Sequence, residues 1–105
     1  MKEYRVLITK DAKADLRRHL GYIKRQFGNT QAIRNVRNDF AETAASLSVI
    51  AGSIREPDSP ALKTRGLKRV NLSEHDYLLL FRVKDGKAEI IRMFHFLEDY
   101  ENKLR

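Results

Sequence analysis

The chain has 105 residues, of which 42% are hydrophobic and 33% charged, so we expect residues 1–105 to form a single domain. It contains no cysteine, which excludes disulfides and thiolate metal sites. The sequence shows neither an apolar run of membrane-spanning length nor the apolar core of a signal peptide, and we expect a cytoplasmic protein without membrane contact. The 21 basic and 14 acidic side chains give a net charge of +7, which favours a polyanionic or acidic partner.

The first half of the chain predicts one strand and two helices. Residues 4–9 alternate between apolar and polar side chains, as a half-buried strand does. Apolar residues then recur every three or four positions, in a helix that Thr9 or Asp11 can cap. Residues 28–30, Gly-Asn-Thr, supply a C-terminal glycine and a new cap, and the same period continues to Leu47. Two long helices in succession predict an αα-hairpin.

The second half predicts a small sheet. Residues 51–66 contain both prolines and read as an irregular surface connection. Three predicted strands follow, at residues 67–72, 77–83 and 88–96. The second of them is almost continuously apolar, which places it centrally in the sheet, and Asp85-Gly86 predicts a tight hairpin after it. The predicted fold is α+β, in the order β-α-α-β-β-β, with the αα-hairpin packed on a mainly antiparallel four-stranded sheet and a short C-terminal helix or tail.

Two segments resemble the RelE/ParE superfamily of toxins from bacterial type II toxin–antitoxin pairs. YRVLITKDAKADLRRHLGYI (4–23) resembles the opening strand and first helix of that superfamily. GLKRVNLSEHDYLLLFRVKDGKAEIIRMFHFLEDY (66–100) resembles its last three strands and a terminal H-R-x-x-x-Y motif. The resemblance implies one of two activities: RelE-like members cleave mRNA in the ribosomal A site without a metal, whereas ParE-like members bind and poison DNA gyrase without catalysis. Members of both kinds are neutralised by an antitoxin.

The C-terminal strand supplies the residues for a nuclease site. RNA cleavage without a metal requires a base, an acid and cations that stabilise charge on the phosphorus. His95 lies at the end of the predicted strand and matches the histidine of the superfamily motif, while Tyr100, five residues later, matches its tyrosine. Arg69 matches a basic position on an earlier strand. We therefore expect His95, Tyr100 and Arg69 to be catalytic, with a core histidine and an edge-strand arginine as the alternatives.

Four further cations are candidates for binding the RNA phosphates. Lys63 and Arg65 precede the strand that carries Arg69, and the alternative for both is a solvated loop charge. Lys68 faces away from Arg69 in an ideal strand, and only a bulge would bring it into the same site. Arg82 lies on the predicted central strand. It is a candidate to replace an arginine that RelE-like nucleases use to bind phosphate and that this chain lacks.

Two positions depart from the nuclease pattern. RelE-like nucleases carry arginine where this chain has Leu78, and again beside the histidine, where it has Phe96. These losses remove two phosphate ligands. They favour the alternative functions, a ParE-like non-catalytic inhibitor of gyrase or a toxin that only binds its antitoxin. The main prediction from the sequence is a RelE-like, ribosome-dependent mRNA endonuclease that inhibits translation.

The predicted partners follow from the same resemblance. We expect a cognate antitoxin, whose extended, acidic segment lies over the toxin, together with the ribosome and mRNA, or gyrase in the alternative. We expect no small-molecule cofactor and no metal, because His19 and His75 lack ligands at metal-binding spacing. Glu98 and Asp99 either orient His95 or begin the C-terminal helix. A basic stripe on the first helix is either an RNA contact or a solvated face; its residues are Arg17, Arg18, Lys24 and Arg25.

Overall fold

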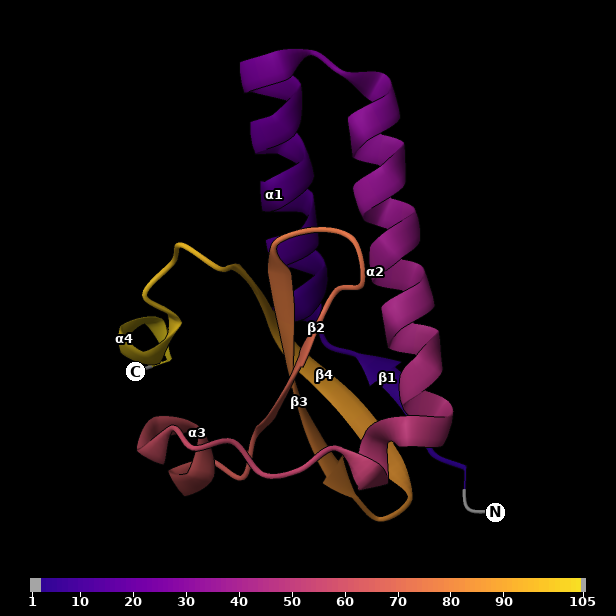
Figure 1. Ribbon diagram of the computed structural model, residues 1–105, viewed down its shortest axis with the longest axis vertical. Coiled ribbons are helices and arrows are strands. Elements are labelled where there is room, and N and C mark those ends of the chain that lie inside the picture. Colours follow the sequence, from indigo (N-terminus) through magenta and orange to yellow (C-terminus); the bar gives the residue numbers. More distant parts are fainter. Residues whose placement is uncertain (1–2, 105) are drawn as a thin grey trace.

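The computed structural model describes residues 3–104 and has the predicted α+β architecture, with the helical hairpin on one face of the sheet (Figure 1). Its elements, in chain order, are β1 (Arg5–Ile8), α1 (Lys10–Phe27), α2 (Thr30–Ile50), the 3-10 turn η1 (Ala51–Ser53), α3 (Pro60–Thr64), β2 (Lys68–Asn71), β3 (Tyr77–Lys84), β4 (Lys87–His95) and α4 (Tyr100–Lys103). The chain measures 40 × 31 × 22 Å along its principal axes.

Local capping fixes the ends of the two long helices. The Thr9 side chain accepts a hydrogen bond from the Ala12 N–H and begins α1. Gly28 ends this helix in the left-handed conformation, with a φ of 59°, and Asn29 then caps α2 through the N–H of Ala32. A turn this short between two capped helices makes them antiparallel neighbours, as the sequence predicts.

The sheet has the strand order β1-β4-β3-β2. β1 pairs parallel to β4, and the other two pairings are antiparallel. Asp85 and Gly86 both have positive φ values, 53° and 76°, and form the tight turn that joins β3 to β4. β3 lies between β4 and β2, which is the central position expected from its apolar sequence.

Both faces of the sheet are covered, by different elements. Alternate residues of β3 point to opposite sides: Leu79 and Phe81 pack under the helical hairpin, whereas Leu78 and Leu80 pack on the other face. The second face is closed by Leu62 of α3 and, in part, by residues of the C-terminal segment. The sheet is thus the middle layer of three, which explains the near-continuous apolar sequence of its central strand.

A β-bulge interrupts the regular alternation of side chains along β4. Leu80 is opposite Arg92 while Phe81 is opposite Ile90, which leaves Ile91 without a partner on β3. The extra residue reverses the pattern, so Ile90 faces the helical hairpin and Ile91 faces away from it. A regular strand, as the sequence predicts, would instead place Ile91 on the face of Met93 and His95 and Ile90 on the face of Phe94.

The connection predicted to be irregular contains a short helix. The Ser59 hydroxyl accepts a hydrogen bond from the Leu62 N–H, and Pro60 occupies the first turn of α3. α3 buries Leu62 completely against the second face of the sheet. Among residues 3–104, none of the helices has the length and hydropathy needed to cross a membrane.

Candidate functional site

His95 ends β4 on the helix-facing side of the sheet and lines a hollow of about 570 Å³. Its imidazole meets the Tyr77 ring edge-on, with the ring centroids 5.0 Å apart. Nδ1 of His95 accepts a hydrogen bond from the Leu97 N–H at 3.1 Å. Nδ1 is therefore unprotonated and the ring proton lies on Nε2. The imidazole thus stabilises the turn that follows the strand.

Glu98 closes the same turn. Its Oε1 accepts the backbone N–H of His95 at 2.9 Å, while Oε2 accepts Lys103 Nζ at 2.8 Å and Arg18 Nη1 at 3.4 Å. Burial alone would raise the pKa of Glu98, but these three donors and the nearby His19 outweigh it and lower the pKa to about 2. Glu98 therefore binds the backbone N–H of His95, and within residues 3–104 it forms no hydrogen bond or ion pair with the imidazole that it was expected to orient.

His19 is a buried polar residue that the sequence analysis considered only as a metal ligand. Its Nε2 lies 3.2 Å from the Met93 carbonyl oxygen, and because a carbonyl only accepts, Nε2 donates. Its ring also meets Tyr77 edge-on, at 4.8 Å between centroids. Burial lowers the pKa of His19. The signal for this position is its spacing of four residues from Asp15 and from Ile23, which are buried on the same face of α1.

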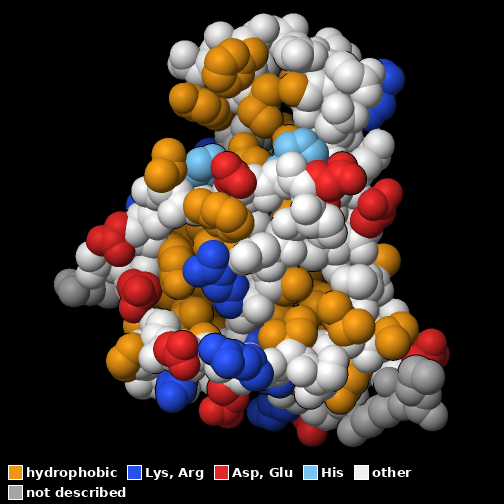
Figure 2. Space-filling view, viewed as in Figure 1, with side chains coloured by type: hydrophobic (Ala, Val, Ile, Leu, Met, Phe, Trp, Pro, Cys, Tyr) orange, Lys and Arg blue, Asp and Glu red, His pale blue; other side chains and the backbone are white. Residues whose placement is uncertain are grey.

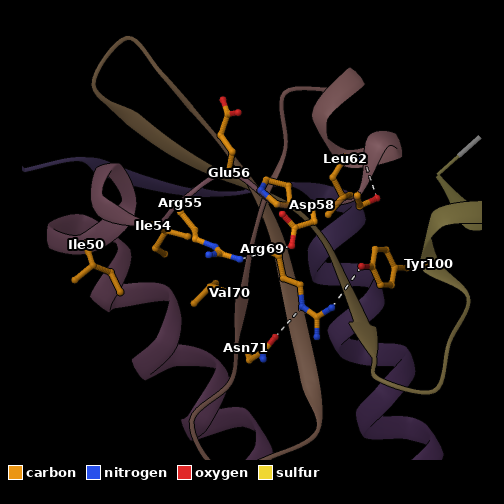
Figure 3. Close-up of a pocket in the computed structure, with 12 residues that line it drawn as sticks. Ile50, Ile54, Arg55, Glu56, Asp58, Leu62, Arg69, Val70, Asn71 and Tyr100 are labelled. Atoms are coloured by element: carbon orange, nitrogen blue, oxygen red, sulfur yellow. Dashed lines mark hydrogen bonds and ion pairs between the residues drawn. The ribbon is translucent and has the colours of Figure 1, made fainter.

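Arg69 and Tyr100 form a separate group on the other face of the sheet (Figure 3). Nη1 of Arg69 donates to the Tyr100 hydroxyl at 3.4 Å, and Nε donates to Asn71 Oδ1 at 2.9 Å. The guanidinium carbon also lies 5.5 Å from the centroid of the Phe96 ring. The exposed tail of the sequence therefore folds back on the edge strand β2, and Arg69 is held between aromatic rings.

The group around Arg69 opens onto a hollow of about 690 Å³ beside β2. Figure 3 shows Ile54 and Val70 on its apolar side, with the Arg55 side chain reaching across it. Arg55 is paired with Asp58 at 3.6 Å, but both side chains are almost fully exposed. The hollow thus combines an apolar floor with exposed surface charge, a lining suited to a peptide segment.

The predicted catalytic residues do not converge. Arg69 contacts Tyr100, whereas His95 packs against the Tyr77 ring and accepts the Leu97 N–H on the helix-facing side of the sheet. The five-residue spacing between His95 and Tyr100 suggested proximity, but the turn at Glu98 carries the chain past the end of β4 to the second face. His95 and the Arg69–Tyr100 pair therefore lie on opposite faces of the sheet.

The four candidate phosphate ligands are also dispersed. Arg82 is paired with Glu89 at 3.2 Å, and Arg65 donates to a backbone carbonyl of the C-terminal segment at 2.9 Å. These two arginines line a shared hollow of about 410 Å³, on the face away from His95. The remaining two are Lys63, exposed on α3, and Lys68, half-buried on β2.

The two departures from the nuclease pattern have structural explanations. Leu78 is 1% exposed and packs with Leu80 and Phe94 on the second face, where an arginine would bury an unpaired charge. Phe96 lies beneath the Arg69 guanidinium. Within residues 3–104 there is also no group of three or more His, Cys, Asp or Glu side chains that could hold a metal ion.

Comparisons with known proteins identify the family to which this arrangement is similar. Residues 6–100 match the model of the family described as "ParE toxin of type II toxin-antitoxin system, parDE". Among solved structures, a chain of the chromosomal ParDE toxin–antitoxin system from P. aeruginosa has a similar fold, with a TM-score of 0.73. The two chains are 20% identical, and the match covers 89% of this chain and 96% of that one. No curated protein matches the chain.

The family match confirms the resemblance to the RelE/ParE superfamily and corrects the predicted activity. The prediction of an mRNA endonuclease is wrong, because the chain matches the ParE branch, for which the resemblance implies no catalysis. The catalytic roles expected for His95, Tyr100 and Arg69 depended on that activity. These residues lie on two different faces of the sheet, which agrees with the loss of support for a nuclease. The ribosome and mRNA, predicted as partners of that activity, lose their support as well.

Proposed function

The chain belongs to the ParE family of toxins from type II toxin–antitoxin systems, and from this premise we propose that it inhibits DNA gyrase by binding it, without chemistry of its own. The family match over residues 6–100 is the observation that carries the proposal. Two further observations support it: the acid–base groups of a nuclease are not assembled, and the helical hairpin extends beyond the sheet as a surface available to a partner (Figure 1).

A plasmid supercoiling assay tests the proposal directly. Purified toxin is added to bacterial gyrase, relaxed plasmid and ATP, and the reaction is stopped with detergent and protease. Binding that traps the enzyme on cut DNA would abolish supercoiling and produce linear plasmid. Heat-unfolded toxin serves as the control. If the folded toxin leaves both supercoiling and plasmid integrity unchanged, the proposal fails, and a toxin that only binds its antitoxin becomes the better description.

A toxin of this class has a cognate antitoxin, and we propose that an extended antitoxin segment occupies the hollow beside Arg69. The support is the lining of that hollow, which joins apolar side chains to two arginines and two carboxylates, Glu56 and Asp58. A second support is the edge of β2, which within residues 3–104 pairs with β3 alone. An acidic segment complements the net charge of +7.

Loss of the Arg69 side chain should therefore weaken the complex with the antitoxin encoded beside the toxin gene. We expect Arg69→Ala to raise Kd about tenfold, since a hydrogen bond to a charged group is worth roughly 1.5–3 kcal/mol. Arg82→Ala removes the same charge from a different hollow and is the matched control. Equal losses in the two variants, measured by calorimetry, would contradict the placement of the antitoxin.

A further inference from the structure

The end of the helical hairpin, residues 17–37, carries six Lys and Arg residues and no acidic residue. We propose that this segment, the hairpin tip, binds the phosphate backbone of duplex DNA. The choice of DNA rests on the proposed function, because gyrase holds duplex DNA and a toxin bound to gyrase lies beside it. The contact is independent of sequence, since it depends on cations and phosphates.

The cations of the hairpin tip are available to a partner. All six are exposed: Arg17, Arg18, Lys24, Arg25, Arg34 and Arg37. Of these six, only Arg18 forms an ion pair within the described chain, with Asp15 and Glu98. Elsewhere in the described chain, exposed arginines such as Arg55 and Arg82 do have carboxylate partners. The other five cations form no ion pair there, and a cluster of exposed cations of this kind is an electrostatic footprint typical of a nucleic-acid contact.

The cations surround the tip on both sides of the hairpin. Lys24 of α1 and Arg37 of α2 line a shared hollow of about 540 Å³ between the two helices. Arg18 and Arg25 line the hollow that also contains His95, on the side towards the sheet. Because charges from both helices project at the same end of the molecule, several of them can reach successive phosphates at once.

Two aromatic side chains at the tip are unusually exposed. Tyr22 is 52% and Phe27 71% exposed. In Figure 2, apolar side chains gather over this end of the molecule, and no acidic side chain appears among them on that face. Rings beside guanidinium groups can contact sugars and base edges while the cations hold the backbone.

Salt-dependent binding tests this inference on the toxin alone. A fluorescent 20-base-pair duplex is titrated with toxin between 50 and 200 mM salt, and log K is plotted against log salt. Arg34→Gln/Arg37→Gln removes two tip charges on exposed positions of α2. Lys84→Gln/Lys87→Gln removes two exposed charges from the β3–β4 turn, at the opposite end of the molecule (Figure 1), and is the matched control.

The tip variant should reduce the steepness of the salt dependence by about 1.8, since each phosphate contact contributes roughly 0.9. The control should retain the wild-type slope. Equal losses in both variants would show that net charge alone attracts DNA, and absence of binding at 50 mM salt would likewise overturn the inference.

The supercoiling assay separates this inference from the proposed function. A toxin that inhibits gyrase but does not bind duplex DNA leaves the proposed function intact and removes the DNA contact. A toxin that binds DNA through the hairpin tip but leaves gyrase active supports the contact and removes the proposed function.

Discussion

Asp39, buried on α2, accepts a 2.7 Å hydrogen bond from Nδ1 of His75 in the turn between β2 and β3. The same carboxylate accepts the backbone N–H groups of Ser73 and Glu74, at 3.1 and 2.9 Å. One side chain of the hairpin thus binds three donors of a turn more than thirty residues away in the sequence. The turn owes its position over the helices to this contact.

Replacing Asp39 should therefore destabilise the fold. Asp39→Ala leaves three donors without their acceptor, and we expect a loss of about 3 kcal/mol in the free energy of unfolding. Urea denaturation measures this loss. Glu42→Ala, on an exposed position of the same helix, should change the free energy by less than about 0.5 kcal/mol. Similar effects from both substitutions would contradict the role assigned to Asp39.

Acid should weaken the C-terminal turn through Glu98. The folded pKa, about 2, is lower than the ordinary value of 4.5, so the folded state binds the proton more weakly than the unfolded state. The stabilisation by Glu98 is therefore fully present above about pH 5, and it is lost as the pH falls from 4.5 towards 2. Asp39 acts in the same direction: burial would raise its pKa, but the hydrogen bonds from the turn lower it.

The Glu98→Gln variant should lose part of this acid dependence. Thermal melting between pH 7 and pH 3 is the measurement, and the variant should have a shallower decline in Tm than the wild type. Glu56→Gln changes an exposed carboxylate that forms no ion pair or hydrogen bond in the described chain, and its profile should follow the wild type. A wild-type profile for Glu98→Gln would refute the assignment.

His95 should be dispensable for inhibition of gyrase. Its imidazole supports the turn by accepting the Leu97 N–H, so His95→Ala should cost about 1 kcal/mol of stability and change the half-inhibitory toxin concentration less than twofold. His95→Asn retains an acceptor that can reach the amide two residues on, and it should recover the stability. A folded His95→Ala protein that has lost inhibition would restore a functional role to the imidazole.

Local sequence patterns predicted most of the secondary structure. Thr9, Gly28 and the Asp85-Gly86 turn mark ends of elements in the sequence, and each does so in the structure because capping and turn formation depend on neighbouring residues. The bulge at Ile91 was missed, because it arises from the register between β3 and β4 rather than from the pattern of β4 itself.

The candidate site was predicted less well, because it too depends on contacts between segments that are distant in the sequence. Arg69 and Tyr100 meet, although 31 positions separate them, because the C-terminal turn folds back over the edge strand. His95 is near Tyr100 in the sequence, yet the strand alternation points it to the other face. Buried polar residues such as Asp15 and Asp39 look like solvated charges in the sequence, since their partners come from distant segments.

Thr43 offers the last test, because it is the one side chain in the described chain with a buried polar atom that forms no hydrogen bond. It lies on the buried face of α2 and is 5% exposed. Valine has nearly the same shape without the hydroxyl, so Thr43→Val should raise the free energy of unfolding by about 1 kcal/mol, or Tm by roughly 4–8 °C. Thr43→Ala removes the methyl group as well and should destabilise the fold. A less stable Thr43→Val protein would mean that the hydroxyl binds a buried water molecule.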